Sequence, residues 1–97
     1  MIFLDNLTTC EIQAYGTVQG VGFRYGTLFI ARSLGLSGWV KNMPDYSVLI
    51  HVKGNKHDII TFIDKLKKGP TPSARVTKLE TTWDIEPPIQ TDFTIIY

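Results

Sequence analysis

The stretch Gly16-Thr-Val-Gln-Gly-Val-Gly-Phe-Arg24 lies where the chain changes from the residue pattern of a strand to that of a helix. Residues 9–18 alternate between apolar and polar side chains, which predicts a strand with one buried face. From Phe23 onward, apolar side chains recur with helical spacing as far as Leu34, and Gly35 follows as a C-terminal stop. The glycine-rich stretch is therefore predicted to be a short loop between a strand and a helix.

The same two periods predict the remaining elements. These are strands over residues 36–42, 47–53, 74–83 and 93–97, and a helix between an Asn55 cap and Gly69-Pro70. Met43-Pro44-Asp45-Tyr46 supplies the turn between the second and third strands. In the fourth strand the apolar alternation slips between Val76 and Leu79, which predicts a bulge or a local twist.

The order strand–helix–strand–strand–helix–strand predicts an α+β sandwich. Both helices should lie on one face of an antiparallel sheet, which has an additional C-terminal strand. The first strand–helix–strand crossover makes the first two strands run parallel to each other. The loop over residues 19–23 therefore emerges at the same end of the sheet as Asn42, the last residue of the second strand. We expect any catalytic or binding residues to lie at this end of the sheet.

Length and composition exclude several classes of protein. The length of 97 residues predicts one domain, residues 1–97. Hydrophobic residues make up 43% of the sequence and charged residues 20%. A formal net charge of +1 argues against electrostatic capture of nucleic acid or of an anionic membrane. Cys10 is a single cysteine, which rules out an intrachain disulfide framework and a cysteine metal cluster. His51 and His57 are too few for a zinc site, so we expect no metal.

The first residues do not have the pattern of a signal peptide. Met1-Ile-Phe-Leu is followed at once by Asp5, without a basic region or a long apolar region. No apolar run in the chain approaches the length needed to cross a bilayer. We therefore expect a cytoplasmic domain with residues 1–8 as an N-terminal extension, whose role stays open.

The glycines of the loop favour an anion site. Without a Cβ in the way, their backbone N–H groups can point toward a common centre. Converging amides at a helix N-terminus, where the helix dipole is positive, attract anions, and Arg24 adds planar donors suited to phosphate oxygens. The loop is not the dinucleotide-binding fingerprint, because the ribose-binding acid and the second crossover half are missing from the sequence. On pattern alone, a small phosphate or carboxylate site and a structural turn with an exposed arginine remain equal alternatives.

Several stretches resemble the acylphosphatase family. The resemblance is carried by Gly16 to Arg24, Gly38-Trp-Val-Lys-Asn42, Ser47 to Gly54, Gly69-Pro-Thr-Pro-Ser-Ala-Arg-Val76 and Phe93 to Tyr97, which together span nearly the whole chain. It implies a ferredoxin-like βαββαβ sandwich that hydrolyses the mixed anhydride bond of acyl phosphates to carboxylate and inorganic phosphate, without metal or cofactor. The implied partner is a small-molecule acyl phosphate, with no nucleic acid or membrane, and we expect the chain to act as a monomer.

The resemblance also implies roles for individual residues. Phosphate binding falls to Arg24 and to the backbone of the glycine loop, which consists of Gln19, Gly20, Val21, Gly22 and Phe23. Positioning of the attacking water falls to Asn42, whose amide does not titrate in the useful range but can donate to and accept from a water. Because the carboxylate of an acyl phosphate leaves readily, neutralising the phosphoryl oxygens and aiming a water suffice. The substrate phosphate is the expected proton acceptor.

Two residues depart from the family pattern. Tyr46 stands four residues after Asn42, where the family has glycine, and Ile96 stands where arginine often precedes the final tyrosine. If position 46 requires a positive φ, tyrosine costs about 1–2 kcal/mol there, or else the turn takes another shape. Either outcome can move Asn42 or place an aromatic ring over the pocket mouth. Ile96 is expected to affect stability or surface charge.

Two other functions fit the predicted fold. A non-catalytic phosphate- or anion-binding module would result if Tyr46 disturbs the placement of the water. An RNA-binding domain of the same topology would need a pair of aromatic-rich strand motifs, which the sequence lacks. Trp39 and Trp83 are instead expected in the core, and His51 is expected to face solvent because it lies in the polar phase of its strand. The enzyme is the leading interpretation.

Overall fold

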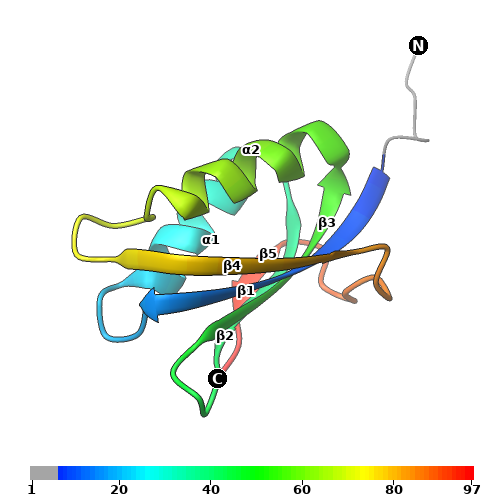
Figure 1. Cartoon of the computed structure of the whole chain (residues 1–97). Coiled ribbons are helices and arrows are strands. Elements are labelled where there is room, and N and C mark those ends of the chain that lie inside the picture. The colour runs from blue at the N-terminus through cyan, green and yellow to red at the C-terminus, as the bar shows by residue number, and fades with distance from the viewer. Residues whose placement is uncertain (1–6) are drawn as a thin grey trace.

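The computed structural model describes residues 7–97, which form five strands and two helices (Figure 1). In chain order these are β1 (Leu7–Thr17), α1 (Phe23–Ser33), β2 (Ser37–Asn42), β3 (Val48–Asn55), α2 (Lys56–Lys67), β4 (Arg75–Trp83) and β5 (Phe93–Ile95). The order of elements is the predicted one. Leu7 and Thr8, which the sequence placed in an extension, pair with Asn55 and Gly54 as part of β1, and residues 1–6 lie outside the described residues.

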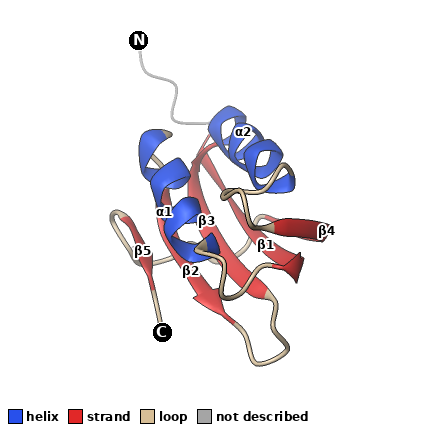
Figure 2. Cartoon of the chain, turned by 90° about the vertical axis from the view of Figure 1, so that its left-hand side faces the viewer, coloured by secondary structure: helices blue, strands red, loops and turns tan. Residues whose placement is uncertain are grey.

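The sheet has the strand order β4-β1-β3-β2-β5. β1 and β2 both pair antiparallel with β3 and so run parallel to each other, as predicted, and β4 pairs antiparallel with β1. β5 pairs parallel with β2, so the sheet is mixed, whereas the sequence predicted an antiparallel one. The connector over residues 84–92 crosses one end of the sheet, and β5 therefore runs opposite to β4. Both helices cover one face (Figure 2), which confirms the ferredoxin-like βαββαβ sandwich with an added C-terminal strand.

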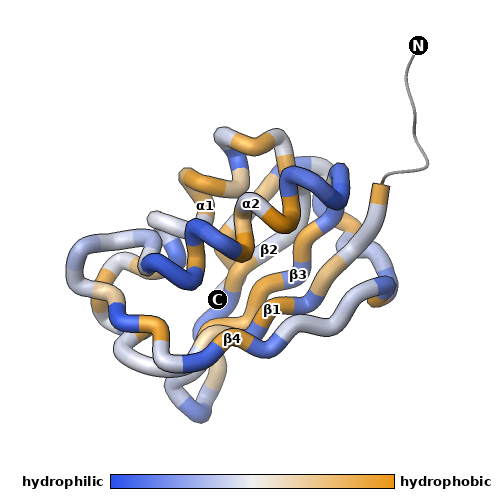
Figure 3. The backbone as a smooth tube through the Cα atoms, turned by 45° about the horizontal axis from the view of Figure 1, so that its top comes forward, coloured by the Kyte–Doolittle hydropathy of each residue, from blue (hydrophilic) through white to orange (hydrophobic). Residues whose placement is uncertain are grey.

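The core lies between the sheet and the two helices, where apolar segments of both layers face each other (Figure 3). Alternate positions of β1 and β3 supply fully buried side chains: Cys10, Ile12, Ala14, Val48, Ile50 and Val52. The Phe62 ring of α2 packs edge-on against the Phe93 ring of β5, with ring centroids 6.1 Å apart. Burying one such side chain stabilises a fold by about 1.5–3 kcal/mol. This shared apolar layer holds the helices on the sheet.

The irregularity predicted in β4 is a β-bulge. Tyr15 pairs with Lys78, whereas the next residue, Gly16, pairs with Val76. Thr77 is therefore the extra residue, at the place where the apolar alternation of the sequence slips. An extra residue shifts the phase of a strand by one, which explains why the alternation resumes on the other parity.

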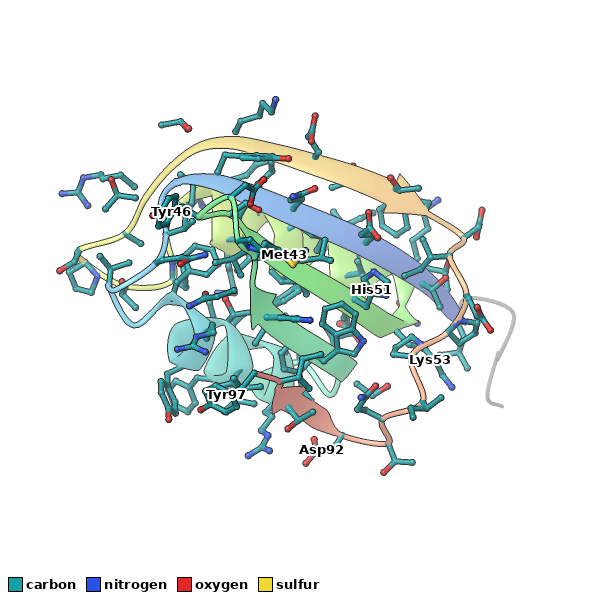
Figure 4. The ribbon with its side chains drawn as sticks, turned by 90° about the horizontal axis from the view of Figure 1, so that it is seen from below. Met43, Tyr46, His51, Lys53, Asp92 and Tyr97 are labelled. Atoms are coloured by element: carbon teal, nitrogen blue, oxygen red, sulfur yellow. The ribbon has the colours of Figure 1, made fainter. Side chains whose placement is uncertain are left out.

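The sheet face opposite the helices carries an aromatic pair, one member of which, Trp39, was expected in the core. Trp39 lies on this open face rather than in the core, and its ring stacks on the imidazole of His51, with ring centroids 4.3 Å apart. Figure 4 shows His51 on this face. Successive residues of a strand point to opposite faces, so the burial of Val40 directs Trp39 outward. His51 is only 23% exposed, because Glu11 Oε2 also lies 2.8 Å from its Nε2 atom. Trp83, by contrast, packs partly buried against the core.

Candidate active site

The N-terminus of α1 has no side-chain cap. Its N-cap residue, Gly22, has φ 75° and ψ 17°, and Gly20 also has φ 75°. Glycine adopts this left-handed conformation without a Cβ clash, which lets the glycine loop turn sharply into the helix. The first turn of α1 contains no acidic residue. The first backbone N–H groups of the helix are therefore available to an external acceptor, at the positive end of the helix dipole.

A pocket of about 200 Å³ opens at this helix end. It is lined by Val18, Gly20, Gly22, Phe23, Arg24, Tyr25 and Asn42. The structure thus brings the glycine loop, Arg24 and Asn42 together at one end of the sheet, because β1 and β2 run in the same direction (Figure 1). Gln19 and Val21, the other residues of the glycine loop, do not line the pocket and contact neighbouring segments instead.

Arg24 is half-buried in the first turn of α1 and has no acidic partner. Within residues 7–97, no carboxylate lies at ion-pair distance from its guanidinium. The guanidinium carbon lies 5.0 Å from the centroid of the Tyr97 ring, a cation–π contact of about 0.5–1 kcal/mol (Figure 4). The neighbouring Tyr25 hydroxyl raises the pKa of Tyr97. Among the described residues, the guanidinium of Arg24 therefore lies against one aromatic ring, that of Tyr97, and has no carboxylate partner.

Tyr25 and Tyr97 were not predicted as neighbours of the pocket or of Arg24. Tyr25 lines the pocket and is 63% exposed, which is a position open to a bound ligand. The contact between Arg24 and Tyr97 joins residues from α1 and from the segment after β5, so no local pattern of the sequence predicts it.

The segment after α2 holds the glycine loop from one side. Thr71 Oγ1 donates to the Val21 carbonyl oxygen at 2.8 Å. α1 approaches this segment so closely that a Cβ on Gly26 would lie 2.8 Å from the carbonyl oxygen of Pro70. The sequence indicated Gly69-Pro70 as a helix end, but the partner of Thr71 lies 50 residues away and is visible only in the fold.

Gln19 holds the glycine loop from the other side. Its Nε2 atom donates to the carbonyl oxygens of Met43 at 2.9 Å and of Ser47 at 2.8 Å. Both acceptors belong to residues 43–47, here called the β2–β3 turn, and Met43 directly follows Asn42. The glycine loop is therefore linked to the turn that follows the Asn42 carboxamide. The sequence predicted a backbone role for Gln19 and missed this role of its side chain.

Tyr46 adopts the positive φ that its position in the β2–β3 turn requires. Its φ is 70°, so the tyrosine carries the expected cost of about 1–2 kcal/mol. The ring is 77% exposed and is not among the residues that line the pocket, which gives no support to the alternative of a ring over the pocket mouth. At the second departure from the family pattern, the Ile96 N–H donates to the Val40 carbonyl oxygen at 2.9 Å and extends the pairing of β5.

The described residues show neither a metal centre nor a membrane-spanning helix. Within residues 7–97, no three His, Cys, Asp or Glu side chains gather as metal ligands. Burial raises the pKa of the Cys10 thiol to about 11, so it stays neutral at ordinary pH. α1 and α2 are both too short to cross a bilayer.

The chain is similar to known proteins of one family, both in sequence and in structure. The acylphosphatase family model matches residues 10–95. An acylphosphatase of Thermotoga maritima is 45% identical over 87 residues, which cover 90% of this chain and 94% of the relative. The crystal structure of an acylphosphatase from Bacillus subtilis superposes with a TM-score of 0.87 at 34% identity, covering 93% of this chain and 99% of that one.

A second solved structure agrees with the first. An acylphosphatase from Coxiella burnetii superposes with a TM-score of 0.88 at 30% identity and covers 95% of both chains. Fold, motifs and nearly complete coverage therefore point in the same direction. The chain belongs to the acylphosphatase family, hydrolases of class EC 3.6.1.7.

Proposed function

We propose that this acylphosphatase uses Arg24 and the amides of the glycine loop to bind the phosphoryl group, and Asn42 to direct the attacking water. The substrate is a small acyl phosphate, whose mixed anhydride bond is hydrolysed to carboxylate and inorganic phosphate. The observation that carries the proposal is the pocket of about 200 Å³ in which the open end of α1, Arg24 and Asn42 meet.

The phosphoryl group fits the end of α1 electrostatically. Its oxygens accept hydrogen bonds from the amides that α1 leaves without a cap, and the helix dipole favours its negative charge. Arg24, which has no carboxylate partner within residues 7–97, supplies a full positive charge and donors in one plane. As charge shifts during the reaction, these fixed donors stabilise the transition state without having to reorganise.

Asn42 lies in the same pocket and contributes a donor and an acceptor for a water. The water oxygen attacks phosphorus on the side opposite the acyl oxygen, and the bond between phosphorus and that acyl oxygen breaks. The electron pair leaves with the carboxylate, and a proton of the water passes to a phosphoryl oxygen. Within the described residues, the pocket lining contains no Asp, Glu or His, which supports the phosphate as the proton acceptor.

A non-catalytic anion-binding module is the second candidate. The observation that favours it is the left-handed Tyr46 in the turn that follows Asn42, where the family has glycine. A turn displaced by this residue would leave the phosphate site intact while it misdirects the water. Binding of inorganic phosphate without turnover would distinguish this module from the enzyme.

The test is the hydrolysis of benzoyl phosphate by the purified protein, with a chelator present. We expect turnover well above the buffer reaction. Arg24→Ala should lower kcat/KM by about 100-fold or more, since it removes contacts to the substrate and to the transition state. Asn42→Ala should lower mainly kcat, because loss of the residue that positions the water slows the chemical step and not the binding of substrate.

Arg32→Ala is the matched control. Arg32 lies on the same helix, but its guanidinium pairs with Asp92 at 3.6 Å and donates to the Phe93 carbonyl oxygen, outside the pocket. This variant should keep kcat/KM within twofold of the wild type. Wild-type turnover no faster than the buffer reaction would reject the enzyme, and full activity of Asn42→Ala would reject the role of Asn42.

A further inference from the structure

A polar network inside the β2–β3 turn is not explained by substrate binding. Asp45 Oδ1 accepts hydrogen bonds from the Ser47 N–H at 3.0 Å and from the Ser47 hydroxyl. Ser47 is buried, and its hydroxyl oxygen in turn accepts from Gln13 Nε2 of β1 at 2.9 Å. Donor and acceptor capacity of the hydroxyl are thus both used. The network fixes the turn against the sheet.

The same turn is joined to the glycine loop through one backbone oxygen. The Ser47 carbonyl oxygen accepts from Gln19 Nε2 at 2.8 Å and also from the Met43 N–H at 2.9 Å. Figure 4 labels Met43 and Tyr46 in this turn. A shift of Ser47 therefore moves two things together, the glycine loop through Gln19 and the end of β2 at Asn42 through Met43.

Tyr46 makes the turn dependent on this network. Its left-handed φ of 70° disfavours the turn for any residue with a Cβ, and its ring, 77% exposed, gains little from packing. The two hydrogen bonds to the Asp45 carboxylate close the turn around Tyr46 in the manner of an Asx turn. In a turn with glycine at this position the strain would be absent.

We infer that Asp45 is a positioning residue of the active site, which acts through Ser47 to keep the strained turn closed and so holds Asn42 and the glycine loop in register. The inference rests on the proposed function of those two parts. It requires an acceptor oxygen at position 45 and not a negative charge, because the two hydrogen bonds from Ser47 both end on one oxygen, Oδ1. Asparagine should therefore replace Asp45, and glycine at position 46 should make it dispensable.

The experiment measures kcat and KM for benzoyl phosphate, together with the thermal unfolding midpoint. Asp45→Ala should lower kcat about tenfold and raise KM about threefold at a temperature where the variant is folded. Asp45→Asn should stay within twofold of the wild type. The double variant Asp45→Ala with Tyr46→Gly should stay within twofold of Tyr46→Gly alone. Asp64→Ala, which removes an exposed aspartate that pairs with Lys68 on α2, is the control and should leave kcat unchanged.

Each outcome decides the inference. Equal kcat for Asp45→Ala and the wild type overturns it, and so does a loss in Asp45→Asn as large as in Asp45→Ala. Failure of Tyr46→Gly to restore the double variant shows that Asp45 does not offset the strain at Tyr46, which also overturns it. An inactive wild type would instead reject the proposed function. In that case, an NMR titration with inorganic phosphate, followed at the amide resonances of Gly20 and Gly22, tests the inference. We expect a threefold weaker Kd for Asp45→Ala, and an unchanged Kd would overturn the inference.

Discussion

The two helices of this protein begin in opposite ways. α2 begins after Asn55, whose side chain accepts from the His57 N–H at 2.9 Å, and its first turn contains Asp58. α1 begins after the left-handed Gly22, with no side-chain cap and no acidic residue in its first turn. The start of α2 has a side-chain acceptor for one amide and a carboxylate in its first turn, and the start of α1 has neither. The difference shows where the fold has room for an external anion.

The two helix starts also lie at opposite ends of the sheet. Asn55, at the end of β3, pairs with Leu7 at the beginning of β1, whereas α1 follows the end of β1. The open start therefore faces Asn42 and the β2–β3 turn, and the capped start faces away from them (Figure 1). Capping and location together support the proposal that an anion binds at the start of α1 and not at the start of α2.

The largest effect is expected when an aspartate is placed in the first turn of α1, at the position that Asp58 occupies in α2. Tyr25 is the third residue of α1, as Asp58 is of α2. In Tyr25→Asp, the new carboxylate should compete with phosphate for the helix amides and for Arg24. We expect KM for benzoyl phosphate to rise about 100-fold, or about 2.7 kcal/mol. The stability of the fold should stay equal or increase slightly, since a carboxylate suits a helix N-terminus.

Tyr25→Asn is the matched control for this prediction. It has nearly the size of the aspartate variant but no charge, and it also removes the hydroxyl that contacts Tyr97. A KM at least tenfold lower than that of Tyr25→Asp assigns the effect to charge. Equal KM values for both variants would show that the open helix end does not bind the phosphoryl group.

The next largest effect is a loss of stability at high pH, caused by the Cys10 thiol. It limits the pH range in which the two helix ends can be compared. Burial raises the pKa of Cys10 from 9.0 to about 11, so the unfolded chain loses this proton first as the pH rises. The contribution of Cys10 to stability is therefore fully present below pH 9 and is lost between pH 9 and 11. About 2 kcal/mol should be lost by pH 10.5.

Denaturant unfolding of the wild type and of Cys10→Ala over this pH range measures the effect. The difference in the free energy of unfolding between the two should change by the stated amount, because other titrating groups cancel. A difference that is constant with pH would show that the thiol is not buried in the folded state.

The smallest effect is expected at the capped end. Asn55→Ala removes the side-chain acceptor for the His57 N–H, which should lower the free energy of unfolding by about 1 kcal/mol. Because this end lies away from the pocket, kcat/KM should stay within twofold of the wild type. Urea unfolding and the benzoyl phosphate assay measure both quantities on one preparation. A large loss of activity would mean that the two helix ends are not independent.

Much of the candidate site was predictable because it depends on local features. The glycine loop, Arg24 and Asn42 were placed together from the change of period and from the direction of the first two strands. The bulge near Thr77 also left a mark in the alternation of the sequence. Trp39 was misplaced, since an aromatic residue in a strand fits the core or a half-covered face equally well. The burial of the neighbouring Val40 directs Trp39 to the open face, where it stacks on His51.

By itself, the sequence determined the order of the elements, the capped start of α2 and the residue types of the pocket, whereas the missing cap of α1 was seen only in the structure. These properties arise from neighbouring residues, whose hydrogen bonds and backbone angles need no distant partner. Only the tertiary structure decided that Gln19 joins the β2–β3 turn, that Thr71 supports Val21 and that β5 runs parallel to β2. Such contacts join segments far apart along the chain, and they form only because packing of the shared core brings those segments together.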